Sequence, residues 1–166
     1  MLIVFSGLPG TGKTTIARLL AVRLGATYLR IDNIEQALRD NGMREVGKTG
    51  YDIANALARS NLALGNQVIA DCVNPLAESR EAWRAIADGE GVGLLDIEVL
   101  CSDLDEHRRR VQGRELDVPG LVPASWQSVC EHDYQPWTVP PLRLDSAQLL
   151  PEEAVQLILE RLAAGQ

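Results

Sequence analysis

Two segments of the sequence match the pattern of a phosphate-binding loop, in which a glycine and four further residues precede Gly-Lys-Thr. The first is GLPGTGKT at residues 7–14, and the second is GMREVGKT at residues 42–49. In such a loop, successive backbone N–H groups surround phosphate oxygens, the lysine contacts the outer phosphates and the threonine hydroxyl binds Mg²⁺. A chain of 166 residues fits one domain, so two complete nucleotide sites are not expected.

The residues around each match distinguish the two loops. A phosphate-binding loop requires a strand before it and a helix after it, because the positive end of that helix faces the same oxygens. LIVFS precedes the first match, and the amphipathic segment TIARLLAVRLG follows it. The second match follows IEQALRDN, which is a polar helix end with no strand to dock into a sheet. We therefore expect nucleotide binding at the first loop only.

The residues of the first loop take separate parts in holding a nucleotide. Backbone N–H groups from about Pro9 to Thr14 would surround the β-phosphate, and Lys13 would reach the β- and γ-oxygens during catalysis. The Thr14 hydroxyl would bind Mg²⁺, and Thr15 would lie near the α-phosphate. The expected nucleotide-binding residues are Gly7, Pro9, Gly10, Thr11, Gly12, Lys13, Thr14 and Thr15.

Short apolar runs alternate with helical patterns along the rest of the chain. Strands are expected at residues 2–5, 27–31, 67–71, 94–101 and 142–145. Helices are expected at residues 13–24, 33–40 and 51–64, from Pro75 to about Asp88, from Ser102 into the arginine cluster at 108–114, within 124–134 and at 151–163. This alternation predicts parallel strands joined by right-handed crossovers, and hence one three-layer α/β domain over residues 1–166.

Two helix starts are assigned from their capping residues. Asn74 precedes Pro75, and an Asn can cap free amides while a Pro at the first helical position loses no hydrogen bond. Ser102 stands three positions before the acidic Asp105, which is the order of a capping box. We therefore expect helices to begin at Pro75 and directly after Ser102.

Acidic residues at strand ends are candidates for proton transfer and metal binding, because ligands of parallel α/β sheets bind beyond the carboxyl ends of the strands. Asp32 follows the second strand and would act as general base or anchor the acceptor hydroxyl, or else cap the helix after it. Asp71 ends the third strand and would organise Mg²⁺ directly or through water, or else order the turn before Asn74. Glu35 lies one helical turn beyond Asp32 and is a further substrate-contact candidate.

Four arginines are candidates for contacting anionic groups. Arg110 and Arg114 are four positions apart and would share one helical face, from which they would neutralise charge that develops during phosphoryl transfer. Arg80, on the helix after Asn74, would contact an anionic substrate or form a surface salt bridge. Arg44, in the connection after the second strand, would close over a substrate or remain a solvated cation.

The composition excludes several classes of protein. The net charge is −7, which argues against binding nucleic acid through a broad basic surface, although residues 1–50 carry a local charge of +3. No apolar stretch approaches the roughly 18 residues of a membrane span, and the start of the chain lacks the features of a secretory signal. Three cysteines without a CxxC pair indicate neither a disulfide framework nor a zinc site. We expect a cytoplasmic protein, and no pattern indicates an oligomeric state.

Five segments together resemble a known family. They are GLPGTGKTT, RID after the second strand, VIADCVNP after the third, HRRRVQGR, and LRLD in the last strand. The chain resembles the small P-loop kinases, an AAA-type ATPase and kinase group similar to chloramphenicol phosphotransferase, gluconate kinase, adenylylsulfate kinase and the kinase part of polynucleotide kinase. The resemblance covers nearly the whole chain, and its first motif is specific for nucleotide binding.

The resemblance implies a P-loop NTPase fold with five parallel strands in the order 2-3-1-4-5, helices on both faces, and a small helical lid at about 103–135. It implies that ATP with Mg²⁺ donates its γ-phosphate to a hydroxyl of a small molecule. Asp32 matches the substrate-side base of the family, and Arg110 and Arg114 match its lid arginines. The loop near Asp145 and Ser146 matches the region beside adenine.

We interpret the sequence as that of an ATP-dependent kinase with a small-molecule hydroxyl acceptor. The rival hypothesis is a nucleotide-binding regulator or slow ATPase, in which closing the lid matters more than any acceptor. A kinase needs an acceptor-facing carboxylate such as Asp32, whereas a regulator needs only the loop and a moving segment. A kinase for nucleic-acid ends is the third hypothesis, with one end held by Arg44 and Arg80.

Overall fold

The structure, a computed structural model, describes residues 1–113 and 117–164. Its sheet contains the strands β1 (Leu2–Ser6), β2 (Thr27–Arg30), β3 (Val68–Asp71), β4 (Leu94–Leu100) and β5 (Leu142–Asp145). All four strand pairings are parallel, and the order is β2-β3-β1-β4-β5. The predicted five-stranded parallel sheet and its strand order are therefore confirmed.

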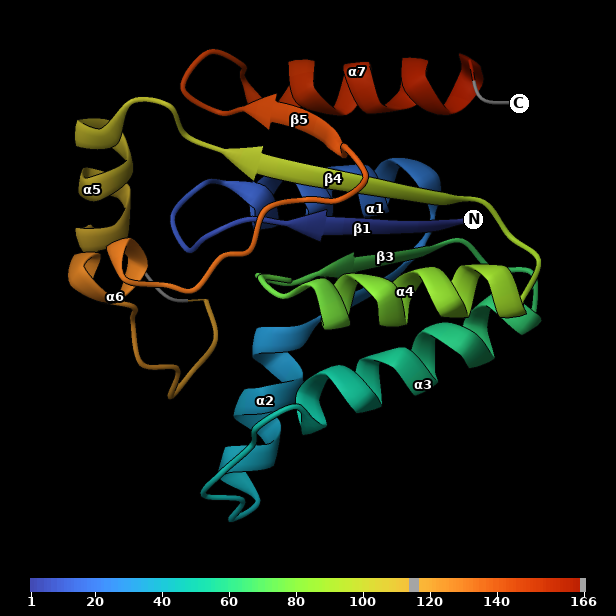
Figure 1. The fold of residues 1–166 in the computed structure, drawn as a ribbon, viewed down its shortest axis with the longest axis horizontal. Helices are drawn as coiled ribbons and strands as arrows, with labels where there is room; N and C mark the ends of the chain where they lie inside the picture. The colour runs from blue at the N-terminus through green and yellow to red at the C-terminus, as the bar shows by residue number, and fades with distance from the viewer. Residues whose placement is uncertain (114–116, 165–166) are drawn as a thin grey trace.

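Helices connect the strands and cover both faces of the sheet (Figure 1). They are α1 (Lys13–Leu24), α2 (Ile31–Asp40), α3 (Thr49–Ala63), α4 (Ala77–Gly89), α5 (Leu104–Gln112), α6 (Trp126–Cys130) and α7 (Pro151–Ala164). Alternate residues of β1 point to opposite faces, as the period of a strand requires. Leu2 and Val4 pack with α3 and α4, whereas Ile3 and Phe5 pack with α1 and α7.

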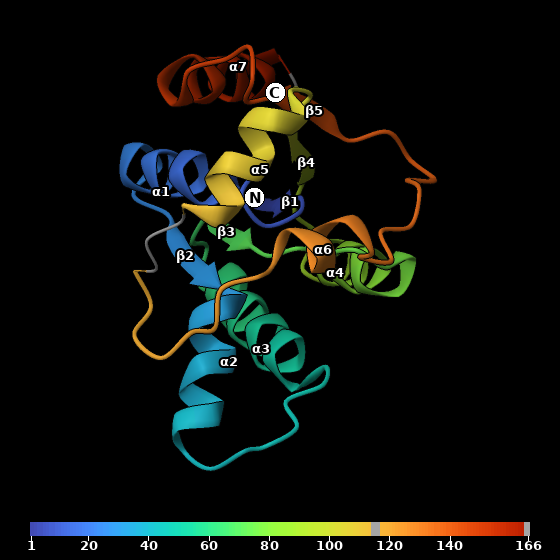
Figure 2. The same ribbon diagram turned by 90° about the vertical axis from the view of Figure 1, so that its left-hand side faces the viewer.

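The carboxyl ends of the strands carry the loops that build the site. Figure 1 shows the arrowheads of β1, β3 and β4 directed toward α5 and α6. In the view turned by 90°, α5 and α6 lie across this edge of the sheet, within the region expected to be a lid (Figure 2). No described helix has both the length and the apolar character needed to cross a membrane.

Both helix starts that were assigned from capping residues are wrong. Helix α4 begins at Ala77 after the cap residue Leu76, not at Pro75. Asn74 instead adopts a positive φ of 51° and its side chain bonds Ser6 and Ser79, which fixes the turn after β3. Asn tolerates this left-handed conformation better than most residues, so a turn competes with the cap.

The second error concerns helix α5. Its cap is Asp103, whose side chain accepts a hydrogen bond from the backbone N–H of Glu106 at 3.0 Å. The backbone N–H of Ser102 instead donates to Asp145 Oδ1 at 3.0 Å. This long-range bond to the loop after β5 moves the helix start by one residue. A capping pattern involves only neighbouring residues, so it does not predict this bond.

The second Gly-Lys-Thr segment joins two helices, as its sequence context predicts. Helix α2 ends at Asp40, and α3 begins at Thr49 directly after Lys48. Figures 1 and 2 both place this connection at the end of the molecule remote from the loop between β1 and α1. No strand delivers the chain to it, so it lacks the strand, turn and helix of a phosphate-binding loop.

Candidate active site

The loop between β1 and α1 depends on three glycines with positive φ angles. Gly7 has φ 143°, Gly10 has φ 83° and Gly12 has φ 85°. A Cβ at Gly7 would lie 2.3 Å from the carbonyl oxygen of Val99, and one at Gly10 would lie 2.5 Å from Cγ2 of Val111. The loop therefore fits between β4 and α5 only because these positions carry no side chain.

Helix α1 begins at Lys13 directly after this loop, with Gly12 as its cap. The first N–H groups of a helix have no partner within the helix, and the helix dipole places partial positive charge there. The Lys13 side chain is only 6% exposed and adds a full charge at the same place. This combination of amides, dipole and cation is suited to binding phosphate groups.

Helix α5 braces the loop from the outside. The ring Nε2 of His107 lies 2.8 Å from the carbonyl oxygen of Pro9, and the ring packs edge-on against Trp126. The Thr11 hydroxyl donates to the carbonyl oxygen of Leu8 at 3.0 Å. Pro9 has no backbone N–H, so the prediction that amides from about Pro9 onward bind phosphate does not apply at Pro9 itself.

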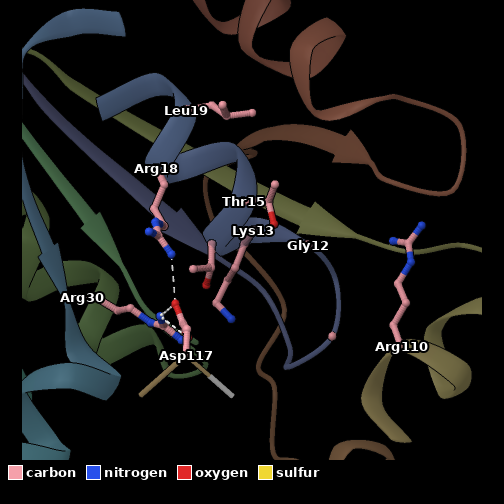
Figure 3. Close-up of a pocket in the computed structure, with 10 residues that line it drawn as sticks. Gly12, Lys13, Thr15, Arg18, Leu19, Arg30, Arg110 and Asp117 are labelled. Carbon is pink, nitrogen blue, oxygen red and sulfur yellow. Dashed lines mark hydrogen bonds and ion pairs between the residues drawn. The ribbon is translucent and has the colours of Figure 1, made fainter. Parts of the chain in front are cut away.

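A cavity of about 490 Å³ opens beside the loop. Its lining residues are Gly10, Gly12, Lys13, Thr14, Thr15, Arg18, Leu19, Arg30, Arg110 and Asp117 (Figure 3). Four of these side chains are basic and one is acidic, so the cavity is positively charged in a protein whose net charge is −7. Such local focusing attracts anionic ligands such as nucleotides.

The carboxylate of Asp71 is buried at the end of β3. Asp71 is the register partner of Phe5 in β1, which places it beside the strand that leads into the loop. Its Oδ2 accepts a hydrogen bond from the Tyr28 hydroxyl at 2.7 Å. Burial, together with the charge of Asp71, raises the pKa of Tyr28, so the tyrosine remains a donor and orients the carboxylate.

The residues present fit a magnesium ion that is held in part by phosphates. No described group of three His, Cys, Asp or Glu side chains is placed to bind a metal ion. Mg²⁺ at nucleotide sites is commonly bound through one or two protein groups together with water and substrate phosphates. Thr14 and Asp71 remain the residues predicted to provide such partial coordination.

Asp32 is the second residue of α2, which begins two residues earlier than the sequence predicted. Its Oδ2 is 3.3 Å from Nη2 of Arg30, the last residue of β2. The Arg30 side chain is only 3% exposed, and its Nη1 lies 2.8 Å from both carboxylate oxygens of Asp117. Arg30 thus connects the predicted acceptor side of the site to the cavity that Lys13 lines.

Arg30, Arg18 and Asp117 line the cavity although the sequence predicted no role for them. Burial by itself would lower the pKa of Arg30, but the hydrogen bond to Asp117 and the surrounding carboxylates raise it, so the buried guanidinium stays charged. A basic residue at the end of an otherwise apolar strand was the available signal for Arg30. Nothing in the sequence pairs it with Asp117, which is 87 positions away.

Arg110 faces the loop after β5. Its Nη1 donates to the Ser146 hydroxyl at 2.8 Å, its Nη2 to the Ser146 carbonyl oxygen at 3.2 Å, and its Nε to Glu106 at 2.7 Å. In Figure 3 it points away from Lys13. Helix α5 ends at Gln112, and Arg114, the predicted companion of Arg110, lies outside the described residues.

The other predicted substrate residues lie apart from this cavity. Glu35 pairs with Arg39 at 3.1 Å and packs against Gly50 on α3. Arg44 is exposed in the remote connection between α2 and α3. Neither residue lines the cavity beside Lys13.

Arg80 has a different role from the predicted substrate contact. It is buried and donates to the backbone carbonyl oxygens of Asn74, Pro75 and Pro136, at 3.0, 3.1 and 3.2 Å. Its guanidinium also stacks on the rings of Tyr134 and Trp137. Both predicted roles of Arg80, the surface salt bridge and the anion contact, are therefore wrong. Arg80 instead connects residues 134–137 to α4.

Comparison with known proteins identifies the family. The chain belongs to the family described as AAA domain, which matches residues 2–131. Its relatives and structural neighbours place it among the small P-loop kinases, so the resemblance stated from the sequence is confirmed. Kinases of this kind carry out ATP-dependent phosphoryl transfer, and they differ in their acceptors.

Individual relatives support this assignment. The chain is 29% identical to the "Probable adenylyl-sulfate kinase" of Aeropyrum pernix over 88% of this chain and 83% of that protein. A crystal structure from Chloroflexus aurantiacus has a TM-score of 0.79 at 23% identity, covering 99% of this chain and 97% of the other. The Mycobacterium tuberculosis APS kinase CysC, in complex with AMPPNP and APS, has a TM-score of 0.69 at 21% identity, covering 98% and 96%.

Proposed function

We propose that this protein is a kinase that transfers the γ-phosphate of ATP to a hydroxyl of a small-molecule acceptor. The observation that carries the proposal is the link through Arg30. This buried side chain lines the same cavity as Lys13 and also contacts Asp32. A phosphate-binding loop and a candidate base are thereby brought to one site, as phosphoryl transfer requires.

Each residue has a defined part in the proposed reaction. The amides at the start of α1 and Lys13 hold the phosphates, and Thr14 and Asp71 hold Mg²⁺, which neutralises charge on the phosphate oxygens when bound. Asp32 orients the acceptor hydroxyl and accepts its proton as the oxygen attacks the γ-phosphorus, while the bond from that phosphorus to the bridging oxygen breaks and ADP leaves. Arg110, with Arg114, is proposed to neutralise charge over the nucleotide.

A second function rests on the contact between α5 and the loop. His107 touches the carbonyl oxygen of Pro9, and a Cβ at Gly10 would clash with Val111, so a nucleotide in the loop would be sensed by α5. A regulator or slow ATPase could use this coupling without any acceptor. The two functions differ in whether an acceptor accelerates ATP consumption.

The test measures ADP release from ATP and Mg²⁺ with a panel of sugars, sugar acids, nucleosides, aminoglycosides and chloramphenicol-like alcohols. One compound should stimulate release, and Asp32→Asn should reduce that stimulation by about 10²- to 10⁴-fold, the usual contribution of a general base. Affinity for AMPPNP should be retained, which shows that the variant is folded. Asp88→Asn, on the exposed surface of α4, is the matched control.

A rate of ADP release that no compound changes would favour the regulator. Stimulation that survives in Asp32→Asn would keep the kinase but remove Asp32 as its base. A nucleic-acid end kinase would instead respond to an oligonucleotide and to none of the small alcohols.

A further inference from the structure

The guanidinium of Arg30 is a buried cation surrounded by three carboxylates. Asp32 lies 3.3 Å from its Nη2, Asp117 lies 2.8 Å from its Nη1, and Asp71 Oδ2 is 4.0 Å from its Nε. Asp71 ends β3 and Asp32 lies in the first turn of α2, whereas Asp117 comes from the loop after α5 and is 45% exposed. Asp117 is thus the most exposed of the three partners, compared with 31% for Asp32 and 1% for Asp71, and the one that a loop carries.

The pairing with Asp117 leaves the arginine incompletely satisfied. Both oxygens of Asp117 accept from the same nitrogen, Nη1, and Nε is buried without a hydrogen-bond partner. A buried donor without a partner costs stability, and an arginine binds an oxyanion best through two parallel bonds. Asp117 therefore engages a single nitrogen of the guanidinium, whereas the buried Nε lies on the side of Asp71, at 4.0 Å from its Oδ2.

A second arginine faces the same carboxylate. Nη1 of Arg18, on α1, donates to Asp117 Oδ2 at 2.9 Å. Figure 3 shows Arg18 and Arg30 converging on Asp117 from two elements, beside the end of Lys13. Two cations from a helix and a strand, aimed at one exposed carboxylate, form a pocket for a single oxyanion.

The loop that carries Asp117 has other anchors. Val118 is buried, and Gly120 packs so closely on α2 that a Cβ there would lie 2.8 Å from Nε2 of Gln36. These contacts hold the loop against α2 without the Asp117 carboxylate. Its pairing with Arg18 and Arg30 can therefore be exchanged for another anion while the loop stays in place.

We propose that Arg30 and Arg18 form a subsite for a carboxylate or phosphate of the acceptor, and that Asp117 competes with this group for the subsite. The inference rests on the proposed kinase function and narrows its substrate to an anionic alcohol. Asp117 then acts as an internal competitor that neutral acceptors have no means to replace.

The position of Arg30 assigns the anion to the acceptor and not to the nucleotide. Nη1 and Nη2 of the same guanidinium contact Asp117 and Asp32, so an anion at Nη1 lies one guanidinium width from the proposed base. The phosphates already have Lys13 and the amides of the loop. The acceptor should therefore carry its charged group within a few bonds of the reacting hydroxyl, as in a hydroxy acid or a phosphorylated alcohol.

Direct binding tests the subsite without any need for turnover. The protein is saturated with Mg²⁺ and AMPPNP, and inorganic phosphate is titrated by calorimetry. Asp117→Asn should bind phosphate at least about threefold more tightly than the parent, because a partly exposed ion pair no longer competes. Arg18→Gln should bind it several-fold more weakly, while Arg23→Gln, on the same helix but outside the cavity, should match the parent.

Kinetics with paired acceptors tests the substrate class. D-gluconate is compared with D-sorbitol, and glycerol 3-phosphate with glycerol, since each pair differs in its anionic group. In Asp117→Asn the KM for a reactive anionic acceptor should fall while kcat changes little. Arg30→Lys, which keeps the charge but loses the fork, should raise that KM by about tenfold, the value of one charge-assisted hydrogen bond.

The outcomes separate this inference from the proposed function. Equal phosphate affinity of the parent, Asp117→Asn and Arg18→Gln would overturn the subsite. Turnover of a neutral acceptor at a rate that Asp117→Asn does not change would also overturn it. In both cases the proposed kinase function would stand. Phosphate binding as expected with no acceptor-stimulated ADP release would remove the kinase and leave an anion site. If Asp117→Asn bound AMPPNP more tightly but ADP with unchanged affinity, the subsite would belong to the γ-phosphate. The proposal that it binds the acceptor would then be overturned.

Discussion

The two segments that share the Gly-Lys-Thr pattern have unlike structures. Residues 7–14 connect β1 to α1, where Gly10 presses against Val111 and Lys13 is almost fully buried. Residues 42–49 connect α2 to α3, where Gly47 has open space around it and Lys48 is exposed. The same spacing of residue types thus gives a closed cradle in one place and an open connection in the other.

The difference shows what the pattern contributes and what it does not. Glycines supply conformational freedom and the lysine supplies charge, and both segments have these. A strand in the sheet delivers only the first segment to the edge where ligands bind, and α5 closes over it. The pattern becomes a phosphate site when neighbouring elements hold its amides in one orientation.

The largest effect is expected when each of the two lysines is replaced by alanine and the two variants are compared. Lys13→Ala removes the buried cation at the start of α1 and should lower kcat by about 100- to 1,000-fold, the usual cost of losing one electrostatic contact to the transferring group. Lys48→Ala removes a cation from the other segment and should stay within about twofold of the parent. ADP release under saturating ATP measures both, and AMPPNP titration reports affinity. A larger loss of activity with Lys48→Ala than with Lys13→Ala would place the phosphate site at residues 42–49.

Alanine at the corresponding glycines tests the role of packing. Gly10→Ala forces a Cβ at positive φ and against Val111, and should lower the free energy of unfolding by roughly 2–4 kcal/mol. Gly47→Ala has only the positive φ to accommodate and should cost about 1 kcal/mol. Urea denaturation at pH 7 measures the two differences. Equal losses would show that the approach of α5 does not make Gly10 necessary.

The smallest expected effect is a dependence of folding stability on acid pH. It should arise from Asp117 in the cavity beside the first loop, and residues 42–49 should show no such dependence. Burial alone would raise the pKa of Asp117, but the hydrogen bond and charge of Arg30, with Arg18, lower it below the ordinary value. Its pairing therefore stabilises the folded protein above the unfolded-state pKa of about 3.9 and is lost as the pH falls through the lower folded-state pKa.

Asp117→Asn should accordingly differ from the parent by no more than about 1 kcal/mol between pH 5 and 7. The difference should vanish as the pH falls below the folded-state pKa of Asp117. Urea midpoints across this pH range measure it, and Gly47→Ala serves as a comparison whose difference should not follow the same titration. A difference that persists in acid would show that Asp117 holds its loop by packing and not by charge.

Local signals predicted the parts of the fold that depend on neighbouring residues in the chain. The strand, glycine turn and helix around Lys13 were predicted because an apolar run, a loop pattern and a helical period follow one another directly. The start of α5 was misplaced because Asp145, from the other end of the chain, binds the N–H of Ser102. Asn74 was misassigned for a similar reason, since Ser6 and Ser79 hold its side chain in a turn.

Candidate site residues followed the same division. Asp32 and Asp71 were predicted as site residues because strand ends face the ligand edge of a parallel sheet. Arg80 is of a residue type that commonly binds anions. In the structure it is buried, and its guanidinium stacks on the rings of Tyr134 and Trp137. Residue type predicted an anionic partner for Arg80, whereas the packing of a distant segment gives it carbonyl oxygens and aromatic rings as partners.

By itself, the sequence determined the parallel α/β architecture, the strand, glycine loop and helix around Lys13, and the position of Asp71 at the end of a strand, because each depends on residues close together in the chain. Only the tertiary structure decided that Arg30 and Arg18 meet Asp117, and that α5 closes on Gly10. These contacts join elements that are far apart in the sequence, and the burial of the sheet on both faces positions them. The geometry of the proposed acceptor subsite therefore belongs to the packing of the fold and not to any motif.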